Sequence, residues 1–205
     1  MNIPNRAKCR LVNYLFYFLI YSFLGWCVEV SYKSISNGQL TNRGFLLGPF
    51  CCIYGIGLLL IIVFLWPVKH NPLLLFIGSA VLSSLLEYTT GYLLEMIFHT
   101  TWWDYSNEPF NLAGRVCLSY SLIWGAISLA VIQIIHPCIR NAVKSIASRI
   151  KITISFVLVW YFITDFAISC IIALENKNKI PHLSNIASLI STFLENIRDF
   201  ITNLL

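Results

Sequence analysis

The chain has 205 residues, of which 58% are hydrophobic and only 11% are charged, whereas about 25% of residues are charged in an ordinary soluble domain. This composition predicts an integral membrane protein and excludes a large soluble catalytic or ATPase domain, because about five spans of roughly 20 residues account for most of the length. The net charge of +5 does not indicate nucleic-acid binding, since the basic residues lie in short connections where membrane topology explains them.

Cysteine and motif content indicate no cofactor. The seven cysteines include no CxxC pair and no zinc-type Cys/His spacing, so neither a disulfide framework nor a structural metal site is expected. The chain also lacks a Walker A phosphate-binding sequence.

The first predicted span covers residues 11 to about 32. Three basic residues in MNIPNRAKCR precede it, which favours a cytoplasmic N-terminus. Glu29 falls in the last turns of this span. It is either an interfacial acid that reaches water or part of a polar site.

The second predicted span covers residues 44 to about 66, and the third covers 73 to 98. Glycines and Pro49 interrupt the start of the second, which indicates close helix packing or irregular backbone beside a cavity. In the third, Glu87, Gly91, Glu95 and His99 are spaced by four, so both acids are expected on one helical face. A carboxylate near the bilayer centre costs about 2.5 to 3.5 kcal/mol, and Arg43 and Arg115 are the nearest candidates to compensate the pair.

The fourth span is predicted from residue 112 to 136 and the fifth from 152 to 174, with Asp165 near the middle of the fifth. Basic residues between them indicate a cytoplasmic connection, or alternatively a contact with anionic lipid or a partner protein. Residues 181–205 have the apolar rhythm of an amphipathic helix. The predicted fold is therefore an all-α polytopic bundle, with one transmembrane domain at 1–180 and a C-terminal amphipathic helix at 181–205.

Alternation of the spans brings the unusual polar residues to one membrane face. The end of the first and third spans, the start of the second and fourth, and the connections around 33–44 and 99–114 all emerge there. The sequence predicts a polar ligand-binding site on this extracytoplasmic side. Its candidate residues are Glu29, Arg43, Glu87, Glu95, Trp102, Trp103, Asp104, Asn111 and Arg115.

Three segments, YSFLGWCVE, NRGFLLGPFCCIYGIG and WWDYSNEPFNLAGRVCLSYSLIWG, resemble the motifs of the "Putative ABC-transporter type IV" family, the CmpB-like bacterial integral membrane proteins. The resemblance covers residues 14 to 125 most strongly, with Cys52 standing where the family usually has proline. It implies a permease-like component of a bacterial cell membrane. Any ATP hydrolysis would then belong to a separate subunit.

Three functions remain open at this point. The first is a permease-like component whose polar cavity binds a small polar or zwitterionic substrate, with Trp102 and Trp103 stacking on a ring or cation. The second is a non-catalytic assembly or regulatory protein whose charges fix helix pairing. The third is an intramembrane enzyme that uses a carboxylate pair. In one version it also holds a metal through Glu95 and His99, for which two ligands are an incomplete set.

Overall fold

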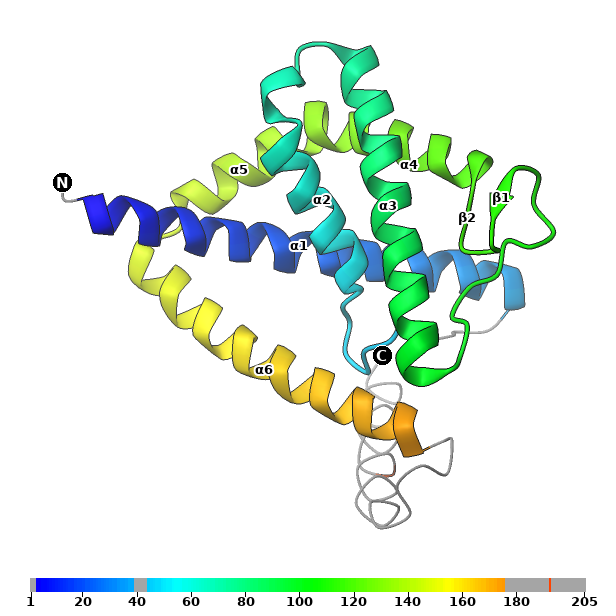
Figure 1. Ribbon diagram of the computed structural model, residues 1–205. Coiled ribbons are helices and arrows are strands. Elements are labelled where there is room, and N and C mark those ends of the chain that lie inside the picture. Colours follow the sequence, from blue (N-terminus) through cyan, green and yellow to red (C-terminus); the bar gives the residue numbers. More distant parts are fainter. Residues whose placement is uncertain (1–2, 39–43, 176–191, 193–205) are drawn as a thin grey trace. The chain divides into compact units, whose positions relative to one another are not determined.

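The computed structural model describes residues 3–38, 44–175 and 192 (Figure 1). Helices dominate these residues, which confirms the predicted all-α class. The chain divides into two compact units after Leu158, and each is treated by itself. Arg43 and the predicted helix at 181–205, apart from the helical residue Thr192, lie outside the described residues.

Four helical stretches are long and apolar enough to cross a membrane, at residues 10–35, 72–98, 118–145 and 148–174. The helices that form them are α1 (Ile3–Asn37), α3 (Pro72–Phe98), α4 (Leu118–Ala130) with η2 (Val131–Ile135) and α5 (His136–Ser145), and α6 (Ser148–Glu175). The chain is therefore a multi-pass membrane protein, as its composition predicts.

The second predicted span is only half helical. Its helix, α2 (Cys52–Phe64), has 13 residues, which gives about 20 Å at 1.5 Å per residue and falls short of the roughly 30 Å hydrocarbon core. Residues 44–51 are not helical, and the amide of Cys51 instead donates to the carbonyl oxygen of Ser22 at 2.9 Å. The irregular backbone that the glycines and Pro49 predict thus finds a partner on α1, as backbone at membrane depth requires.

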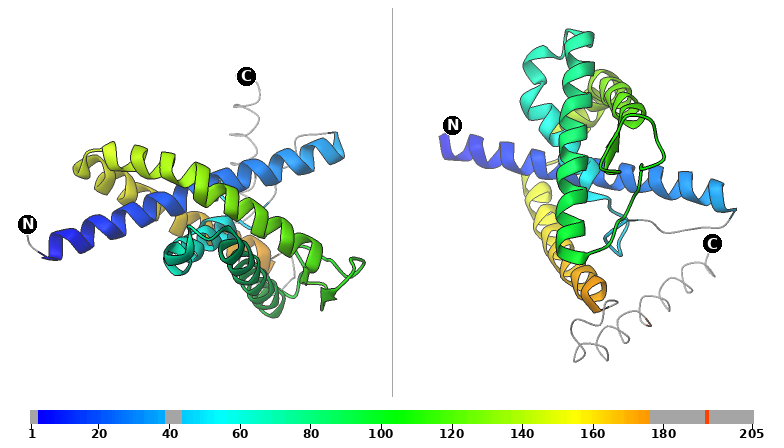
Figure 2. Two further views of the ribbon diagram at one scale, coloured as in Figure 1. Left: turned by 90° about the horizontal axis from the view of Figure 1, so that it is seen from above. Right: turned by 45° about the vertical axis from the view of Figure 1, so that its right-hand side comes forward.

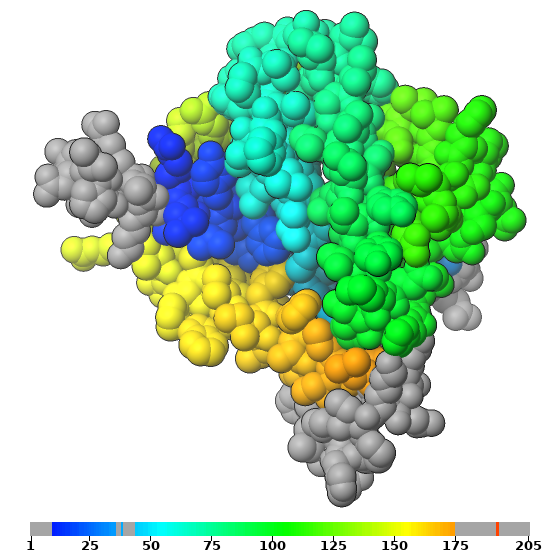
Figure 3. All heavy atoms as spheres, in the orientation of Figure 1, coloured from blue at the N-terminus to red at the C-terminus, as the bar shows by residue number. Residues whose placement is uncertain are grey.

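Glycines allow α1 and α2 to approach closely. A Cβ on Gly55 would lie 2.7 Å from the backbone oxygen of Phe18 and still closer to the Ser22 hydroxyl. A Cβ on Gly25 would overlap the Tyr54 ring. Small residues at such crossings let helix backbones come together in membranes. In Figure 3 the side chains of α2 lie between those of α1 and α3.

Capping residues set both ends of α3, the third predicted span. The Asn71 side chain accepts a hydrogen bond from the Leu74 amide at 3.2 Å, and Pro72 occupies the first turn, a favourable pattern for a helix start. The helix ends at His99, which is left-handed with φ 52° and donates its amide to the Glu95 carbonyl at 2.7 Å. His99 has therefore left the helix, and the four-residue spacing of the sequence does not extend to it.

The fourth helix begins later and ends later than the predicted 112–136. Residues 111–117 form a small antiparallel hairpin of β1 (Asn111–Leu112) and β2 (Val116–Cys117), with Leu112 opposite Val116. The helix then continues past Pro137 to Ser145. The π-helical turn of η2 directly before this proline loosens the hydrogen-bond ladder at the point where a backbone donor is missing.

The apolar core of the first unit lies where α1, α2, α3, η2 and α5 meet. Its most enclosed members include Tyr21, Ile61, Leu75, Ile132 and Val143. Figure 2 shows α1 running across α2 and α3 rather than parallel to them. The start of α6 is also joined to α1, because the Lys151 ammonium donates to the Asn13 side-chain oxygen at 2.9 Å.

Candidate functional site

Two carboxyls, the buried Glu87 and the half-buried Glu29, form the centre of the polar region. The Tyr54 hydroxyl donates to Glu29 Oε1 at 2.5 Å, joining α2 to α1. The Tyr105 hydroxyl donates to Glu87 Oε1 at 2.9 Å, joining the loop at 99–110 to α3. The two carboxyls are close enough to repel each other electrostatically.

Glu87 is the most enclosed acid of this region, with 7% of the residue exposed. Its Oε2 is buried and accepts no hydrogen bond of normal geometry from the described part of the chain, although the Trp124 side chain of α4 interacts with the same carboxyl. The Trp124 ring also lies 5.2 Å from that of Tyr54. Burial and the nearby Glu87 raise the pKa of Tyr105, so its hydroxyl stays a donor. We call Glu29, Tyr54, Glu87, Tyr105 and Trp124 the carboxyl cluster.

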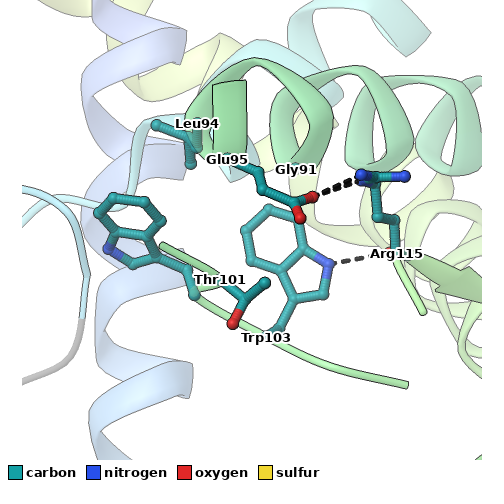
Figure 4. A pocket seen from close by; sticks show the side chains of 7 residues that line it. Gly91, Leu94, Glu95, Thr101, Trp103 and Arg115 are labelled. Atoms are coloured by element: carbon teal, nitrogen blue, oxygen red, sulfur yellow. Dashed lines mark hydrogen bonds and ion pairs between the residues drawn. The ribbon is translucent and has the colours of Figure 1, made fainter. Parts of the chain in front are cut away.

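A second group lies two helical turns farther along α3. Arg115 directs both Nε and Nη2 to Glu95 Oε2, and the two side chains are 21% and 41% exposed. The Trp103 indole donates to the Arg115 carbonyl at 2.8 Å. Hydrogen bonding to Glu95 raises the pKa of Arg115. Figure 4 shows these three side chains gathered at one place, with Arg115 linked to both of the others.

A recess adjoins this ion pair. The space open to a water-sized molecule is ≈ 10 Å³, which is enough for about one water. The recess is therefore not a preformed substrate cavity in this conformation. The lining residues are Gly91, Leu94, Glu95, Thr101, Trp102, Trp103 and Arg115.

Asp104 and Asn111, both candidate ligand residues, build the loop. Asp104 Oδ1 accepts from the Ser106 amide at 2.9 Å and from the Ser106 hydroxyl at 2.5 Å. Both hydrogen bonds lower the pKa of Asp104, and the bond from the hydroxyl has the larger effect. Asn111 Nδ2 donates to the carbonyls of Ser106 at 3.1 Å and Glu108 at 2.9 Å. Its Oδ1 accepts from the Gly114 amide, so these side chains hold the turn that positions Tyr105 and Arg115.

The structure divides the predicted site rather than gathering it. Glu29 and Glu87 enter the carboxyl cluster, and Glu95 and Arg115 pair beside the recess. Trp102 packs against Phe45 and Phe98, with ring centroids 5.7 and 5.6 Å apart. Glu87 and Glu95, eight residues apart on α3, have no common partner among the described contacts.

Sequence reasoning missed Tyr54, Tyr105 and Trp124. All three stand inside the motifs CCIYG, WWDYS and SLIWG, which carry the family resemblance. Tyrosine hydroxyls are donors that can satisfy a buried carboxyl without adding charge. A tyrosine close to a predicted buried acid was therefore the sequence signal that could have identified Tyr54 and Tyr105. Within the described residues no group of three or more His, Cys, Asp or Glu side chains could hold a metal ion.

The apolar helices and the polar groups between them define an all-α multi-pass membrane protein. Its chain belongs to the family described as "Putative ABC-transporter type IV", whose model matches residues 16–170. No curated protein and no solved structure matches the chain significantly.

Proposed function

We propose that the protein is the membrane-spanning component of a transporter, and that its carboxyl cluster recognises the amino group of a small polar or zwitterionic substrate. The observation that carries this proposal is Glu87, a carboxyl buried inside a long apolar helix. Ionisable groups at such positions are expensive and are typically retained for ion or substrate recognition.

The surroundings of Glu87 favour a positively charged or donor group. Its described partners are the Tyr105 hydroxyl, the Trp124 side chain and the repelling carboxyl of Glu29. None of these supplies a cation. A ligand amino group would donate to the Glu87 carboxyl and reduce the repulsion between the two acids. Two tyrosines and a tryptophan supply the aromatic surface that also suits an amine.

Separation along α3 limits what one ligand can touch. Glu87 and Glu95 are eight residues apart, which corresponds to roughly 12 Å of helix rise. A small amino acid is much shorter than this, so its amino and carboxylate groups would not reach Glu87 and Arg115 together. The amino group is therefore the recognised part of the substrate, and Arg115 serves the loop.

The proposal also covers the ATPase partner, the orientation of the chain and the membrane in which it lies. Family membership and the absence of a Walker A sequence support an ATPase carried on a separate subunit. The basic residues at the start of α1 and along α5 support a cytoplasmic N-terminus. The family resemblance supports a bacterial cell membrane, with the carboxyl cluster approached from the extracytoplasmic side.

A non-catalytic assembly role is the second candidate, and the Glu95–Arg115 pair favours it. This pair, together with the Trp103 indole, ties the 99–117 loop to α3. Charged groups can be retained in membranes because they fix how helices and loops associate.

Thermal unfolding of the purified protein in detergent, with and without a panel of proteinogenic amino acids, tests the proposal. At least one amine is expected to raise the midpoint for the wild type and for Glu108→Gln, the control that removes a carboxylate from the loop. Glu87→Gln is expected to fold and lose this shift. An unchanged shift in Glu87→Gln, or no shift with any amine, contradicts recognition at Glu87.

Arg115→Ala separates the two candidate functions. Under the transport proposal it loosens the loop but leaves the amine-dependent shift in place, since Arg115 does not touch the ligand. If Arg115→Ala and Glu87→Gln both fail to accumulate in the membrane, these charges act in assembly.

A further inference from the structure

A second polar group lies near the middle of α1, beside α5 and η1 (Trp66–Val68). The Tyr21 hydroxyl and His136 Nδ1 lie 2.7 Å apart, and both residues are almost fully buried, with 1% and 2% exposed. The Tyr17 ring meets the His136 ring edge-on at 5.0 Å, and the Trp66 ring does so at 5.6 Å. The Trp66 ring therefore packs against a buried, hydrogen-bonded histidine.

Two cations converge on the Trp66 ring. Lys69 Nζ lies 3.7 Å from the ring centroid, and the guanidinium carbon of Arg140 lies 5.4 Å from it. Both side chains are half-buried, so they lie against the protein instead of extending into water. The two positive charges come from different elements, since Lys69 follows η1 and Arg140 belongs to α5.

No acid of the described chain balances these cations. The first unit contains five acidic residues, and neither Lys69 nor Arg140 forms an ion pair with any of them. Like charges held near one indole repel each other, and an anion between them would relieve that repulsion. These acids belong to the carboxyl cluster or the 99–117 loop, or, in the case of Glu95, pair with that loop. They are Glu29, Glu87, Glu95, Asp104 and Glu108.

We propose that Trp66, Lys69 and Arg140 bind the phosphate group of an anionic phospholipid. A lysine ammonium and an arginine guanidinium offer several charge-assisted donors to phosphate oxygens. The Tyr17 hydroxyl adds a polar group beside Arg140. Tryptophan is the side chain that membrane proteins place at headgroup level.

Apolar side chains beside the site favour a lipid over free phosphate. Phe64 and Leu73 flank η1 in the chain and are 64% and 65% exposed. They are surfaces that acyl chains can cover while the headgroup meets the two cations. Free phosphate would gain nothing from them, because it has no apolar part.

Lipid binding to the purified full-length chain in dodecylmaltoside micelles tests this site. The wild type is expected to bind phosphatidylglycerol more tightly than phosphatidylcholine, measured by native mass spectrometry and by the rise in unfolding midpoint. The double variant Lys69→Gln with Arg140→Gln is expected to bind phosphatidylglycerol about tenfold or more weakly, given the attraction of each lost cation to anionic lipid.

The control variant is Lys144→Gln with Arg149→Gln. It removes the same charge from exposed residues of the neighbouring basic segment and is expected to keep most of the preference for phosphatidylglycerol. Equal losses in the two double variants overturn the site, because a diffuse positive surface then explains binding. Inorganic phosphate that stabilises the wild type as strongly as the lipid overturns the lipid assignment.

If the double variant does not fold, the single variants Lys69→Gln and Arg140→Gln and the charge-conserving Arg140→Lys decide the matter. Each single loss is expected to weaken phosphatidylglycerol binding, and Arg140→Lys to retain most of it. Unchanged binding in both single variants contradicts the site.

Discussion

At the scale of single residues, tyrosine hydroxyls are what make buried carboxyls tolerable in this protein. Glu29 and Glu87 each accept a hydrogen bond from a tyrosine on another element. Such a bond satisfies a carboxyl oxygen without introducing a counter-charge. The cluster thereby keeps its acidic character, which is the property that recognition of an amine requires.

Tyr105→Phe tests how far Glu87 depends on this bond. The substitution keeps the ring and removes only the O–H, so it leaves a buried carboxyl oxygen without its donor and is expected to cost about 1 to 3 kcal/mol of stability. The drop in unfolding midpoint in detergent measures it. Tyr92→Phe is the control, because Tyr92 is exposed and its hydroxyl donates no hydrogen bond among the described contacts. Equal effects of the two substitutions would contradict the role given to Tyr105.

At the scale of elements, α2 is a half-length helix whose position depends on its contact with α1. Its irregular approach at 44–51 is anchored by the bond from Cys51 to the Ser22 carbonyl. The glycines at the crossing then bring Tyr54 within reach of Glu29. Close packing of α1 and α2 is therefore a condition for one half of the carboxyl cluster.

Gly55→Ala and Gly57→Ala form a matched pair that tests this packing. The added methyl at Gly55 meets the Phe18 backbone at 2.7 Å, whereas at Gly57 it meets only Leu86 Cδ2 at 3.3 Å. Overpacking against backbone is expected to destabilise Gly55→Ala by about 1 to 3 kcal/mol. Gly57→Ala should change little, because a flexible side-chain end can move. Thermal unfolding measures both, and equal stability of the two variants would show that α2 is loosely held.

At the scale of the whole molecule, charge is segregated along the chain. The acids of the first unit lie in the carboxyl cluster and at or beside the 99–117 loop, whereas eight of its eleven basic residues lie at the start of α1, after η1, along α5 and at the start of α6. The Tyr17 ring, in the first half of α1, contacts His136 at the start of α5. The positive-inside rule predicts a common cytoplasmic side for the basic segments.

Cysteine labelling in intact cells checks the orientation. In a variant whose seven native cysteines are replaced by serine or alanine, a cysteine at position 37 is expected to react with a membrane-impermeant maleimide. One at position 144 should react only after permeabilisation. A cysteine at position 107, in the 99–110 loop, serves as the control and should behave like position 37. The reverse pattern would place the N-terminus outside.

Span positions were largely predictable because long apolar segments and their caps are local signals. The third span was expected at 73–98 and occurs at Pro72–Phe98. The fourth was placed six residues too early, since LAGRVC is apolar enough to continue a helix. The Asn111 side chain, which accepts from the Gly114 amide, and the pairing of β1 with β2 hold this stretch in a hairpin instead, and such bonds are not visible in hydropathy.

The sequence by itself determined that this protein crosses the membrane repeatedly, because hydrophobicity is a property of each residue. Only the tertiary structure decided the partners. Spacing along α3 placed Glu87 and Glu95 on one face, yet eight residues turn the helix by about 80° beyond whole turns. Tyr105 meets the first acid and Arg115 the second. That choice depends on how a loop from another part of the chain lies across α3.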